Sequence, residues 1–592
     1  MPEPLSRRRL LKTVAGVSAA SALTACHSEQ RQSFTLGQAE AGGLFAHGLA
    51  SGDPTSSAII LWTRLTPSFL KSQTDENKSD ENRPIPVKWE VCQNPDFKII
   101  DASGTVQANP ARDYTVKVDA DGLRAGTTYY YRFGAGDRLS PVGKTATLPA
   151  DSLQKARFAI VSCANWQHGL FNAYDHISRQ NHFDALIHLG DYYYEYGAGR
   201  YISEPMKTMG RVHKPAHETV TLEDYRTRHA QYRSDPALQA LSAKMPFIVI
   251  WDDHETANDS WQEGAENHQV DEGEGEWSAR KKAALRAYFE WMPIREPKGA
   301  QTPQSLFRSY EYGDLLTLMT LETRLLARGE QIIIDDYFDM LREQGGPERF
   351  RDDVLNDPTR DMLGAAQLEA IANVMKQSKA AGKPWRLFAN QVVMGEVLSP
   401  DLRPYVDEAA LQAIEKVWDG VRQFVDLSQY NLPVYPDSWD GYPVARERLY
   451  KTLAVIGVED MLVITGDAHE YWVNDLTRKD GTKMGVELCT TSVSSETLRA
   501  FMGDGTADYA LLLTQKNKDV RYYNAMNNGY LDLELTRTKA KARLIAVDRV
   551  DSHDYTAFEA VNFTLKPTKN TLKATAPKGL NFKQRLLFHG LG

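Results

Sequence analysis

Between residues 43 and 149 the hydrophobic positions fall in short runs rich in β-branched and aromatic residues. Gly, Pro, Asn and Asp, which favour turns, separate these runs. The strand-like runs lie at 58–62, 87–91, 114–118 and 128–133. Several short strands at such spacing predict a small all-β sandwich. The stretch 71–84 is charged and poor in apolar residues, so we expect an exposed loop there.

After residue 149 the pattern changes to continuous apolar runs that alternate with amphipathic stretches of helical period. Runs of this kind are typical of strands buried on both faces of a sheet. The apolar runs are 158–161, 185–189, 247–251, 385–389 and 461–464, and the helical stretches include 278–291 and 364–380. The sequence therefore predicts an α/β domain over residues 150–565.

Three segments of this domain have less regular patterns. The acidic, Gly-rich stretch 262–276 is predicted to be a surface loop. Residues 329–361 are interpreted either as a lid over a site or as a helical insertion on the surface. Residues 529–535 alternate between apolar and polar side chains, which indicates an edge or outer strand.

The first 26 residues have the pattern of an export signal. Residues 6–12 carry a twin-arginine motif with Arg7 and Arg8, and the apolar stretch 13–25 is shorter than the ~20 residues that a membrane-spanning helix needs. Residues 23–26 resemble a lipobox, in which Cys26 is acylated after cleavage; the alternative is a plain signal peptide cut after Ala22. We therefore expect export by the twin-arginine machinery and a periplasmic or outer-surface protein, anchored to the membrane through Cys26.

Two polar segments flank the predicted domains. Residues 27–42 are small and polar, and we expect them to form a tether. Residues 566–592 form a basic tail without acidic residues. A solvated tail is the favoured interpretation, and contact with an anionic membrane is the alternative.

Composition and charge narrow the functional classes. The chain has 592 residues, of which 42% are hydrophobic and 25% charged, as in globular proteins. Its formal net charge of −9 argues against a nucleic-acid partner held by the phosphate backbone. Behind the leader only Cys92, Cys163 and Cys489 remain. An odd number of widely spaced cysteines is no disulfide framework, so at least one thiol needs another explanation.

Polar side chains able to bind metal follow each of the five apolar runs. In open α/β sheets, sites form beyond the carboxyl ends of the strands, so these side chains can converge. The residues are Cys163 after the first run, Asp191 and Tyr194 after the second, Asp253 after the third, Asn390 after the fourth, and Asp467 and His469 after the fifth.

This mixture of donors suits the hydrolysis of phosphate esters. Two metal ions ~4 Å apart can hold the phosphoryl oxygens and activate a water as nucleophile. The thiol of Cys163 and the phenol of Tyr194 favour a transition metal, whereas carboxylate and amide oxygens also suit calcium. Taken singly, Cys163 could be a small core residue and Tyr194 part of an aromatic cluster. Together the five strand ends favour a metal site, whereas His188, inside its run, is interpreted as a core histidine.

Several motifs also resemble those of the alkaline phosphatase D (PhoD) family. They lie at 45–54, 61–64, 188–197, 251–255, 288–295 and 390–393. The resemblance covers about residues 43 to 560 and implies a calcineurin-like core, a four-layer α/β/β/α metallophosphoesterase sandwich. A fibronectin/Ig-like all-β sandwich would precede it.

The resemblance also implies roles for individual residues. Cys163, Asp191, Tyr194 and His469 would hold Fe(III), with Asp191 bridging to a second site. Asp253, Asn390 and Asp467 would face that second site, which the family fills with Ca²⁺. His254 would lie beside the phosphate as hydrogen-bond donor or as proton donor to the leaving alkoxide.

This chain departs from the family pattern at two places. The family's Asn-Asn pair is Asn258-Asp259 here, which puts a role of the second position in doubt. The family's Leu-Asp-Thr-Arg has Glu322 as its second residue, which is interpreted as a change in packing or support rather than in chemistry.

The sequence therefore predicts an exported enzyme that hydrolyses phosphate monoesters, and also diesters, through a metal-bound hydroxide. We expect a monomer that acts on small phosphate esters. The alternatives are a dedicated phosphodiesterase or phospholipase D-like hydrolase on the same fold, or a surface binding protein without catalysis.

Overall fold

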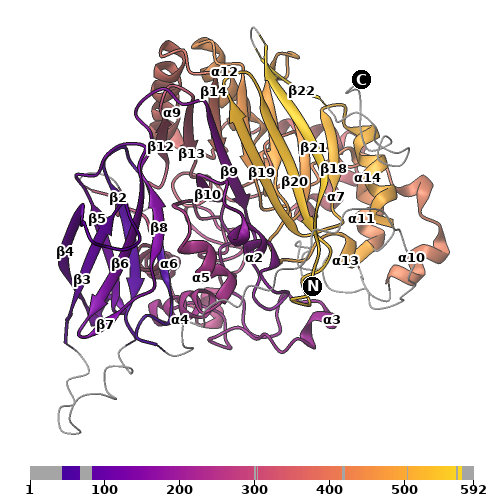
Figure 1. Cartoon of the computed structure of the whole chain (residues 1–592). Coiled ribbons are helices and arrows are strands. Elements are labelled where there is room, and N and C mark those ends of the chain that lie inside the picture. The colour runs from indigo at the N-terminus through magenta and orange to yellow at the C-terminus, as the bar shows by residue number, and fades with distance from the viewer. Residues whose placement is uncertain are drawn as a thin grey trace.

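Two large β-sheets form the centre of the protein (Figure 1). The computed structural model describes residues 43–66, 83–298, 302, 305–415, 420–502, 505–568 and 571–575. The first sheet has ten strands, in the order β22-β21-β20-β19-β9-β10-β11-β1-β2-β5. Its strands are β1 (Leu49–Gly52), β2 (Ile59–Arg64), β5 (Thr115–Ala120), β9 (Lys155–Val161), β10 (Ala185–His188), β11 (Phe247–Val249), β19 (Gly529–Thr536), β20 (Ala540–Val547), β21 (Ala557–Pro567) and β22 (Leu572–Thr575).

The second sheet has seven strands, in the order β12-β13-β14-β15-β17-β16-β18. Its strands are β12 (Arg308–Tyr312), β13 (Leu316–Thr320), β14 (Trp385–Ala389), β15 (Met461–Thr465), β16 (Tyr471–Thr477), β17 (Lys483–Cys489) and β18 (Val520–Asn524). Apolar side chains from both sheets, such as Ile160 and Phe158 from the first and Leu387 and Ile464 from the second, belong to one buried cluster. The two sheets therefore pack face to face.

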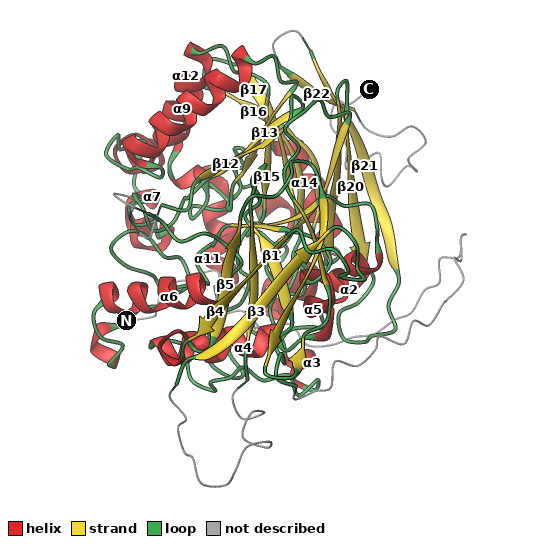
Figure 2. Cartoon of the chain, turned by 60° about the vertical axis from the view of Figure 1, so that its left-hand side comes forward, coloured by secondary structure: helices red, strands yellow, loops and turns green. Residues whose placement is uncertain are grey.

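Helices cover the outer faces of this pair of sheets (Figure 2). Helices α9 (Gly364–Ala380) and α12 (Pro443–Val455) pack on the seven-stranded sheet, where Ile371 and Leu449 meet Val463 of β15. The ten-stranded sheet is covered by α2 (Asn172–Arg179), α4 (Leu222–Arg233), α5 (Pro236–Ser242) and α6 (Trp277–Trp291). The predicted α/β/β/α layering is thus confirmed, as are the helices at 278–291 and 364–380.

The predicted all-β sandwich is present at the N-terminal side. A five-stranded sheet contains β3 (Ile85–Cys92), β4 (Ala102–Ala108), β6 (Thr128–Ala135), β7 (Arg138–Leu139) and β8 (Gly143–Ala146). Its inner side chains, such as Val91 and Phe133, share a buried cluster with Leu61 of β2 and Val118 of β5. The second layer of the small sandwich is therefore one end of the ten-stranded sheet.

The ten-stranded sheet joins the two units expected on either side of residue 149. Strand β1 pairs in parallel with β11, with Gly52 opposite Phe247. A Cβ atom at Gly52 would lie 2.6 Å from the carbonyl oxygen of Phe247, so this close approach requires glycine. At the other end of the sheet, β22 lies beyond residue 565, within the expected basic tail.

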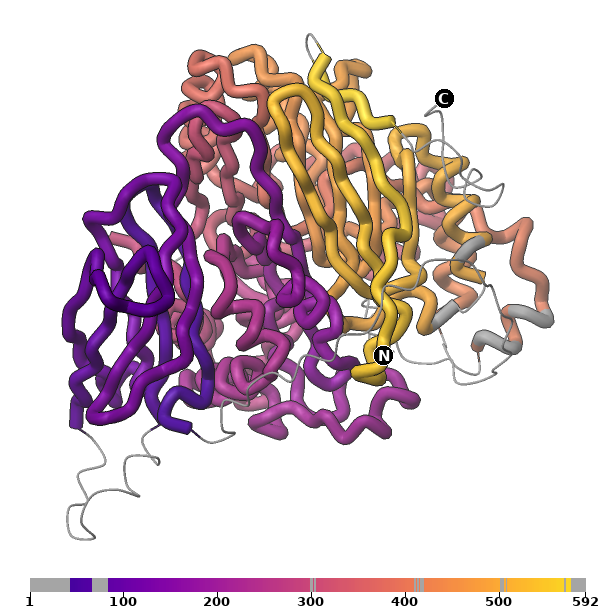
Figure 3. The backbone as a smooth tube through the Cα atoms, in the orientation of Figure 1, coloured from indigo at the N-terminus to yellow at the C-terminus, as the bar shows by residue number. Residues whose placement is uncertain are grey.

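The expected edge strand at 529–535 is an interior strand. Strand β19 pairs antiparallel with β9 on one side and with β20 on the other, beside which the C-terminal strands run (Figure 3). Its polar position Asp532 is buried and accepts hydrogen bonds from Arg157 Nε, 2.7 Å away, and from Arg543 of β20. The prediction of an edge strand was wrong because arginines of the two neighbouring strands pair with the Asp532 carboxylate, so a polar residue is accommodated inside the sheet.

The structure also describes the segments 262–276 and 329–361, whose sequence patterns are less regular. Residues 262–276 form a largely exposed loop, as predicted. Residues 329–361 contain α7 (Phe338–Arg342), α8 (Gly346–Arg349) and the π-helical turn η5 (Phe350–Leu355), which pack through Leu341 and Phe350 on a small cluster with Leu427. The segment is therefore helical and packs on the protein through a small cluster of its own.

The expected signal peptide and tether (1–42), most of the predicted loop 71–84 and residues 576–592 of the tail lie outside the described residues. Among the helices in the described ranges, none combines the length and apolar composition that crossing a bilayer requires. The chain also contains the helices α3 (Glu204–Lys207), α10 (Glu408–Glu415), α11 (Val421–Leu427), α13 (Arg499–Met502) and α14 (Gly505–Lys516).

Candidate metal centre

Loops at the ends of parallel strands carry the predicted ligands. Strands β9, β10 and β11 run parallel to one another, as do β14 and β15 in the facing sheet. Cys163 follows β9, Asp191 follows β10, and Asp467 and His469 follow β15. The backbone N–H of Asp467 donates to Ser162 Oγ over 3.2 Å, which ties the loops of the two sheets together.

Four of these ligand residues adopt a left-handed backbone conformation. The φ angles of Cys163, Asp191, Asp467 and His469 are 61°, 52°, 64° and 61°. Residues with a Cβ atom seldom adopt this region, because the side chain crowds the backbone. Strain of this kind accumulates at functional sites, where the surrounding structure holds it.

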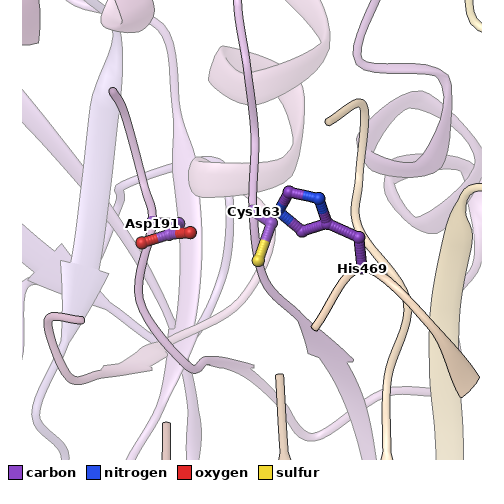
Figure 4. Close-up of side chains that lie close together, drawn as sticks. All are labelled: Cys163, Asp191 and His469. Atoms are coloured by element: carbon purple, nitrogen blue, oxygen red, sulfur yellow. The ribbon is translucent and has the colours of Figure 1, made fainter. Parts of the chain in front are cut away.

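The first group of ligand atoms combines a thiol, a carboxylate and an imidazole (Figure 4). The ligand atoms of Cys163, Asp191 and His469 lie within 4.8 Å of one another. Tyr194 joins them, because its hydroxyl lies 3.0 Å from Asp191 Oδ2 and 3.1 Å from His469 Nε2. The structure thus brings together the four residues that the family resemblance assigns to the ferric ion.

The orientation of His469 fits metal binding. Its Nδ1 lies 2.8 Å from the carbonyl oxygen of Glu496, so Nδ1 carries the proton and donates. Nε2 then presents its lone pair towards Asp191 and Tyr194. Metal-binding histidines are commonly fixed by such a bond from the other ring nitrogen.

A second group of acidic side chains adjoins the first. Ligand atoms of Asp191, Asp253 and His254 lie within 4.8 Å of one another, as do those of Asp252, Asp253 and Asp467. Asp191 belongs to both the first and the second group, which is the position of a bridging carboxylate. Asp252 is the one member of these groups that the sequence prediction omitted.

Asn390 is held by hydrogen bonds to neighbouring residues of its own sheet and loops. It is buried, its Nδ2 donates to the carbonyl oxygen of Val392 over 2.5 Å, and its Oδ1 lies 3.4 Å from Trp439 Nε1. These hydrogen bonds hold the side chain without linking it to Asp253 or Asp467. Six of the seven predicted metal ligands are brought together by the contacts above.

The charge state of the cluster in the metal-free protein also fits a cation site. Burial raises the pKa of the Asp191 carboxyl well above its usual value, against the opposing effect of His254. Burial likewise raises the pKa values of the Cys163 thiol and the Tyr194 phenol, and Asp191 adds to both shifts. Among the described residues, Asp191 Oδ1 and Asp252 Oδ2 have no hydrogen-bond partner. Buried acids of this kind ionise when a cation is bound, so the residues present fit a metal centre.

Arg324 supplies a fixed positive charge beside the second group. It is fully buried, and its Nε donates to Asp252 Oδ1 while Nη1 lies 2.8 Å from Asp437 Oδ2. Its Nη2 lies 3.3 Å from Asp253 Oδ1 and 3.5 Å from Asp467 Oδ1. Burial raises the pKa of the Asp253 carboxyl, but Arg324 and then His254 outweigh that effect and lower it overall. Sequence reasoning noted the motif at 321–324 without giving this arginine a role.

Glu322 in the same motif has a structural role. Its buried carboxylate accepts hydrogen bonds from Trp251 Nε1 at 2.9 Å, and from the backbone N–H groups of Leu325 at 2.7 Å and Leu326 at 2.8 Å. These bonds hold the turn that leads into Arg324. The interpretation of Glu322 as a change in support is therefore confirmed.

His254 is held in place by a glutamate that the sequence prediction missed. His254 Nδ1 lies 2.7 Å from Glu195 Oε2, and the His254 ring lies against Tyr194 with 4.1 Å between ring centroids. The other oxygen of Glu195 accepts from the backbone N–H of Asn258 and from Asn267 Nδ2. Glu195 stands in the motif at 188–197, which was the available signal. The spacing of the residues does not show that its partner is His254.

The chain's Asn258-Asp259 pair contributes through its backbone. The N–H of Asn258 donates to Glu195, and the N–H of Asp259 donates to Asp253 Oδ2 over 2.6 Å. Any residue type supplies this amide group, so the second donation does not depend on the family's asparagine. Asp253 therefore accepts a backbone hydrogen bond from Asp259 in this chain.

Two smaller expectations are also met. His188 is a core histidine, since its Nε2 bonds the Tyr174 hydroxyl at 2.8 Å and its Nδ1 accepts from the Gly190 N–H. Cys92, Cys163 and Cys489 are all free and buried. Of these three thiols, the metal-binding group contains Cys163.

Comparisons with known proteins agree with this arrangement. The model of the PhoD-like phosphatase family matches residues 158–544, and that of the PhoD-like phosphatase N-terminal domain matches residues 29–149. Alkaline phosphatase D of Bacillus subtilis (strain 168) is 35% identical over 506 residues, which cover 84% of this chain and 76% of that protein. A solved structure of PhoD superposes with a TM-score of 0.71 at 30% identity, covering 91% of this chain and 93% of that one. The chain is therefore a phosphoric ester hydrolase that belongs to the PhoD-like phosphatase family.

Proposed function

We propose that this protein hydrolyses phosphate monoesters, and also diesters, at the centre formed by the strand-end loops of the two sheets. One observation carries the proposal: a thiol, a phenol, an imidazole and three carboxylates of the predicted set meet there although they are spread over residues 163–469. Bound metal ions would neutralise phosphoryl oxygens and lower the pKa of water, which is the chemistry that ester hydrolysis needs.

The protein's own residues then orient the ester and manage the proton. His254 lies beside Asp191 and Asp253, and we assign it the proton donation to the leaving alkoxide. Glu195 fixes the His254 ring and stabilises its charged form. Burial lowers the pKa of His254, but Asp253, Asp191 and Glu195 outweigh it and raise that pKa well above its usual value. A raised pKa favours the protonated form that a general acid requires.

We propose Fe(III) for the first group and Ca²⁺ for the second. Cys163 and Tyr194 support iron, because thiolate and phenolate ligands favour a transition metal. Asp253 and Asp467 support calcium, with Asn390 as a further oxygen ligand through the free lone pair of Oδ1. Elemental analysis of protein purified without a metal-affinity tag tests this assignment, with one iron and calcium expected per chain. Iron-free, calcium-free active protein would exclude it.

The kind of ester is tested by turnover of matched substrates. We would compare p-nitrophenyl phosphate, bis-p-nitrophenyl phosphate and a phospholipid with wild-type protein and with Asp191→Asn. The proposal expects turnover of the monoester and the diester, and loss of both in the variant. Turnover of the diester or the phospholipid alone would instead identify the dedicated diesterase or the phospholipase D-like enzyme. Activity that is equal in the variant would contradict the proposal and favour a binding protein without catalysis, with the activity coming from a contaminating enzyme.

We propose further that the protein is exported as a monomer by the twin-arginine route and anchored through Cys26. The support is the sequence pattern of residues 6–26. Fractionation of cells that express wild type, an Arg7→Lys/Arg8→Lys double variant or Cys26→Ser tests the route. The double variant should stay in the cytoplasm, and Cys26→Ser should move from the membrane to the soluble exported fraction. Export of the double variant at the wild-type level would refute the route.

A further inference from the structure

One tyrosine near the metal centre is more exposed than its neighbours. Tyr194 and Tyr196 are fully buried behind His254, whereas Tyr201 is partly exposed. The Tyr201 ring stacks on Tyr194 with 5.4 Å between centroids and an interplanar angle of 25°. Its centroid lies 6.0 Å from that of the His254 ring and 6.4 Å from that of the His469 ring. Tyr201 is therefore a partly exposed ring that lies near both His254 and His469.

The backbone holds Tyr201 in this position against its own preference. Its φ angle is 52°, in the left-handed region that a bulky side chain disfavours. Asn165 Nδ2 donates to the Tyr201 carbonyl oxygen over 3.0 Å, and Gln167 Nε2 donates to that of Arg200 over 3.0 Å. Both amide side chains are buried and lie in the loop that carries Cys163. The strained turn is thus fastened to the metal-binding loop itself.

Tyr201 also packs on Tyr196, with 5.2 Å between ring centroids, but strain of this kind accumulates at functional sites. A partly exposed ring contributes less to the core than the buried rings of Tyr194 and Tyr196 do. In the proposed function, which this inference extends, His254 protonates the oxygen of the departing alcohol. That alcohol therefore leaves beside His254, and Tyr201 is the partly exposed ring among the tyrosines around His254.

We propose that Tyr201 determines specificity by contacting the alcohol part of the phosphate ester. Its ring offers a flat, apolar surface next to the scissile bond, and aromatic or heteroaromatic groups stack on such surfaces. Aryl esters and nucleoside phosphates are then preferred over esters of small aliphatic alcohols. Tyr201 does not take part in the bond-breaking step, which remains with the metal centre and His254.

The experiment compares kcat/KM for phenyl phosphate and for glycerol 2-phosphate in wild type, Tyr201→Phe and Tyr201→Leu. Leucine bears the same backbone strain as tyrosine but lacks the ring. We expect Tyr201→Leu to lower the ratio of the two kcat/KM values about tenfold, whereas Tyr201→Phe keeps it. The matched control is Tyr405→Leu, at a tyrosine 65% exposed in the turn η6 (Arg403–Tyr405), which should leave the ratio unchanged.

Metal content and inhibition separate this role from a structural one. Tyr201→Leu should bind the wild-type amount of metal, and wild type should bind phenylphosphonate about tenfold more tightly than methylphosphonate. The inference would be overturned if kcat/KM fell equally for both esters in Tyr201→Leu. It would also be overturned if phenylphosphonate and methylphosphonate had equal inhibition constants in wild type. The inhibition constants are measured on wild type, so they can overturn the inference even if the leucine variant does not fold. Wild type that hydrolyses neither ester would refute the proposed function itself.

Discussion

Glu195 and His254 form a buried pair in which Glu195 Oε2 lies 2.7 Å from His254 Nδ1. A carboxylate only accepts hydrogen bonds, so the ring nitrogen donates and the opposite nitrogen, Nε2, faces away from Glu195. Glu195 is itself held by the N–H of Asn258 and by Asn267. The pair thus fixes the ring and favours its protonated form.

Replacing Glu195 by Gln tests this pair. Glutamine keeps the shape but removes one of the three charges, those of Asp253, Asp191 and Glu195, that raise the pKa of His254. A general acid acts in its protonated form, and activity is lost as the pH rises through its pKa. A lower pKa of His254 therefore moves the alkaline limb of the kcat/KM profile to lower pH. We expect kcat to fall about 10²-fold at alkaline pH, within the range of general acid catalysis. The exposed Glu204→Gln serves as control, and an unshifted profile in Glu195→Gln would contradict the role.

Arg324→Met tests the fixed charge in the second acidic group. Asp252, Asp253 and Asp467 would lose the guanidinium beside them, whereas Asp437 keeps Arg328, and breaking buried ion pairs costs about 3–5 kcal/mol. The loss in the free energy of unfolding should be largest in chelator-treated protein, because bound metal ions also neutralise Asp253 and Asp467. Urea unfolding with and without metal measures both effects, with Arg422→Met at an exposed ion pair as control. Equal destabilisation in the two states would show that Arg324 and the metal are independent.

Asn390→Ala decides whether that side chain is a metal ligand. If Oδ1 binds calcium, the variant should bind calcium about tenfold more weakly, since support or ligand changes cost 10–100-fold in affinity. The iron content should stay unchanged because Asn390 is not in the first group. Isothermal titration of metal-free protein measures the affinity. Unchanged calcium binding would leave Asn390 with the structural bonds to Val392 and Trp439 alone.

Tyr194→Phe tests the phenolate ligand. The hydroxyl of Tyr194 lies 3.0 Å from Asp191 and 3.1 Å from His469, and Ser495 Oγ donates to it over 2.7 Å. A ferric phenolate absorbs visible light by charge transfer, so wild type should be coloured and Tyr194→Phe colourless at similar iron content. A visible band that persists unchanged in the variant would remove Tyr194 from the ligand set.

Local patterns predicted most elements of this fold. Continuous apolar runs identified β9, β10, β14 and β15, and the period of 364–380 identified α9 with its observed bounds. The pairing of β1 with β11 could not be predicted, since it joins residues about two hundred positions apart through one close backbone contact. The interior place of β19 was missed for the same reason, because Arg157 comes from a distant strand.

The sequence predicted those site residues that have metal-binding side chains and follow a predicted strand. It did not predict the residues whose role depends on tertiary contacts. Cys163, Asp191 and His469 follow apolar runs, and their donor types already indicated metal. Arg324 and Glu195 are ordinary charged residues in the sequence. Only their burial against Asp252 and His254 makes them part of the site.

The central claim is that the grouped side chains around Asp191 bind the metal ions on which hydrolysis depends. Its most direct test is the metal content of wild type and Asp191→Asn, measured together with phosphate release from p-nitrophenyl phosphate and with the exposed Asp480→Asn as control. The account predicts bound metal and activity in wild type and control, and loss of both in Asp191→Asn. Wild-type protein that is free of metal and fully active, or an Asp191→Asn variant with unchanged metal and activity, would contradict it.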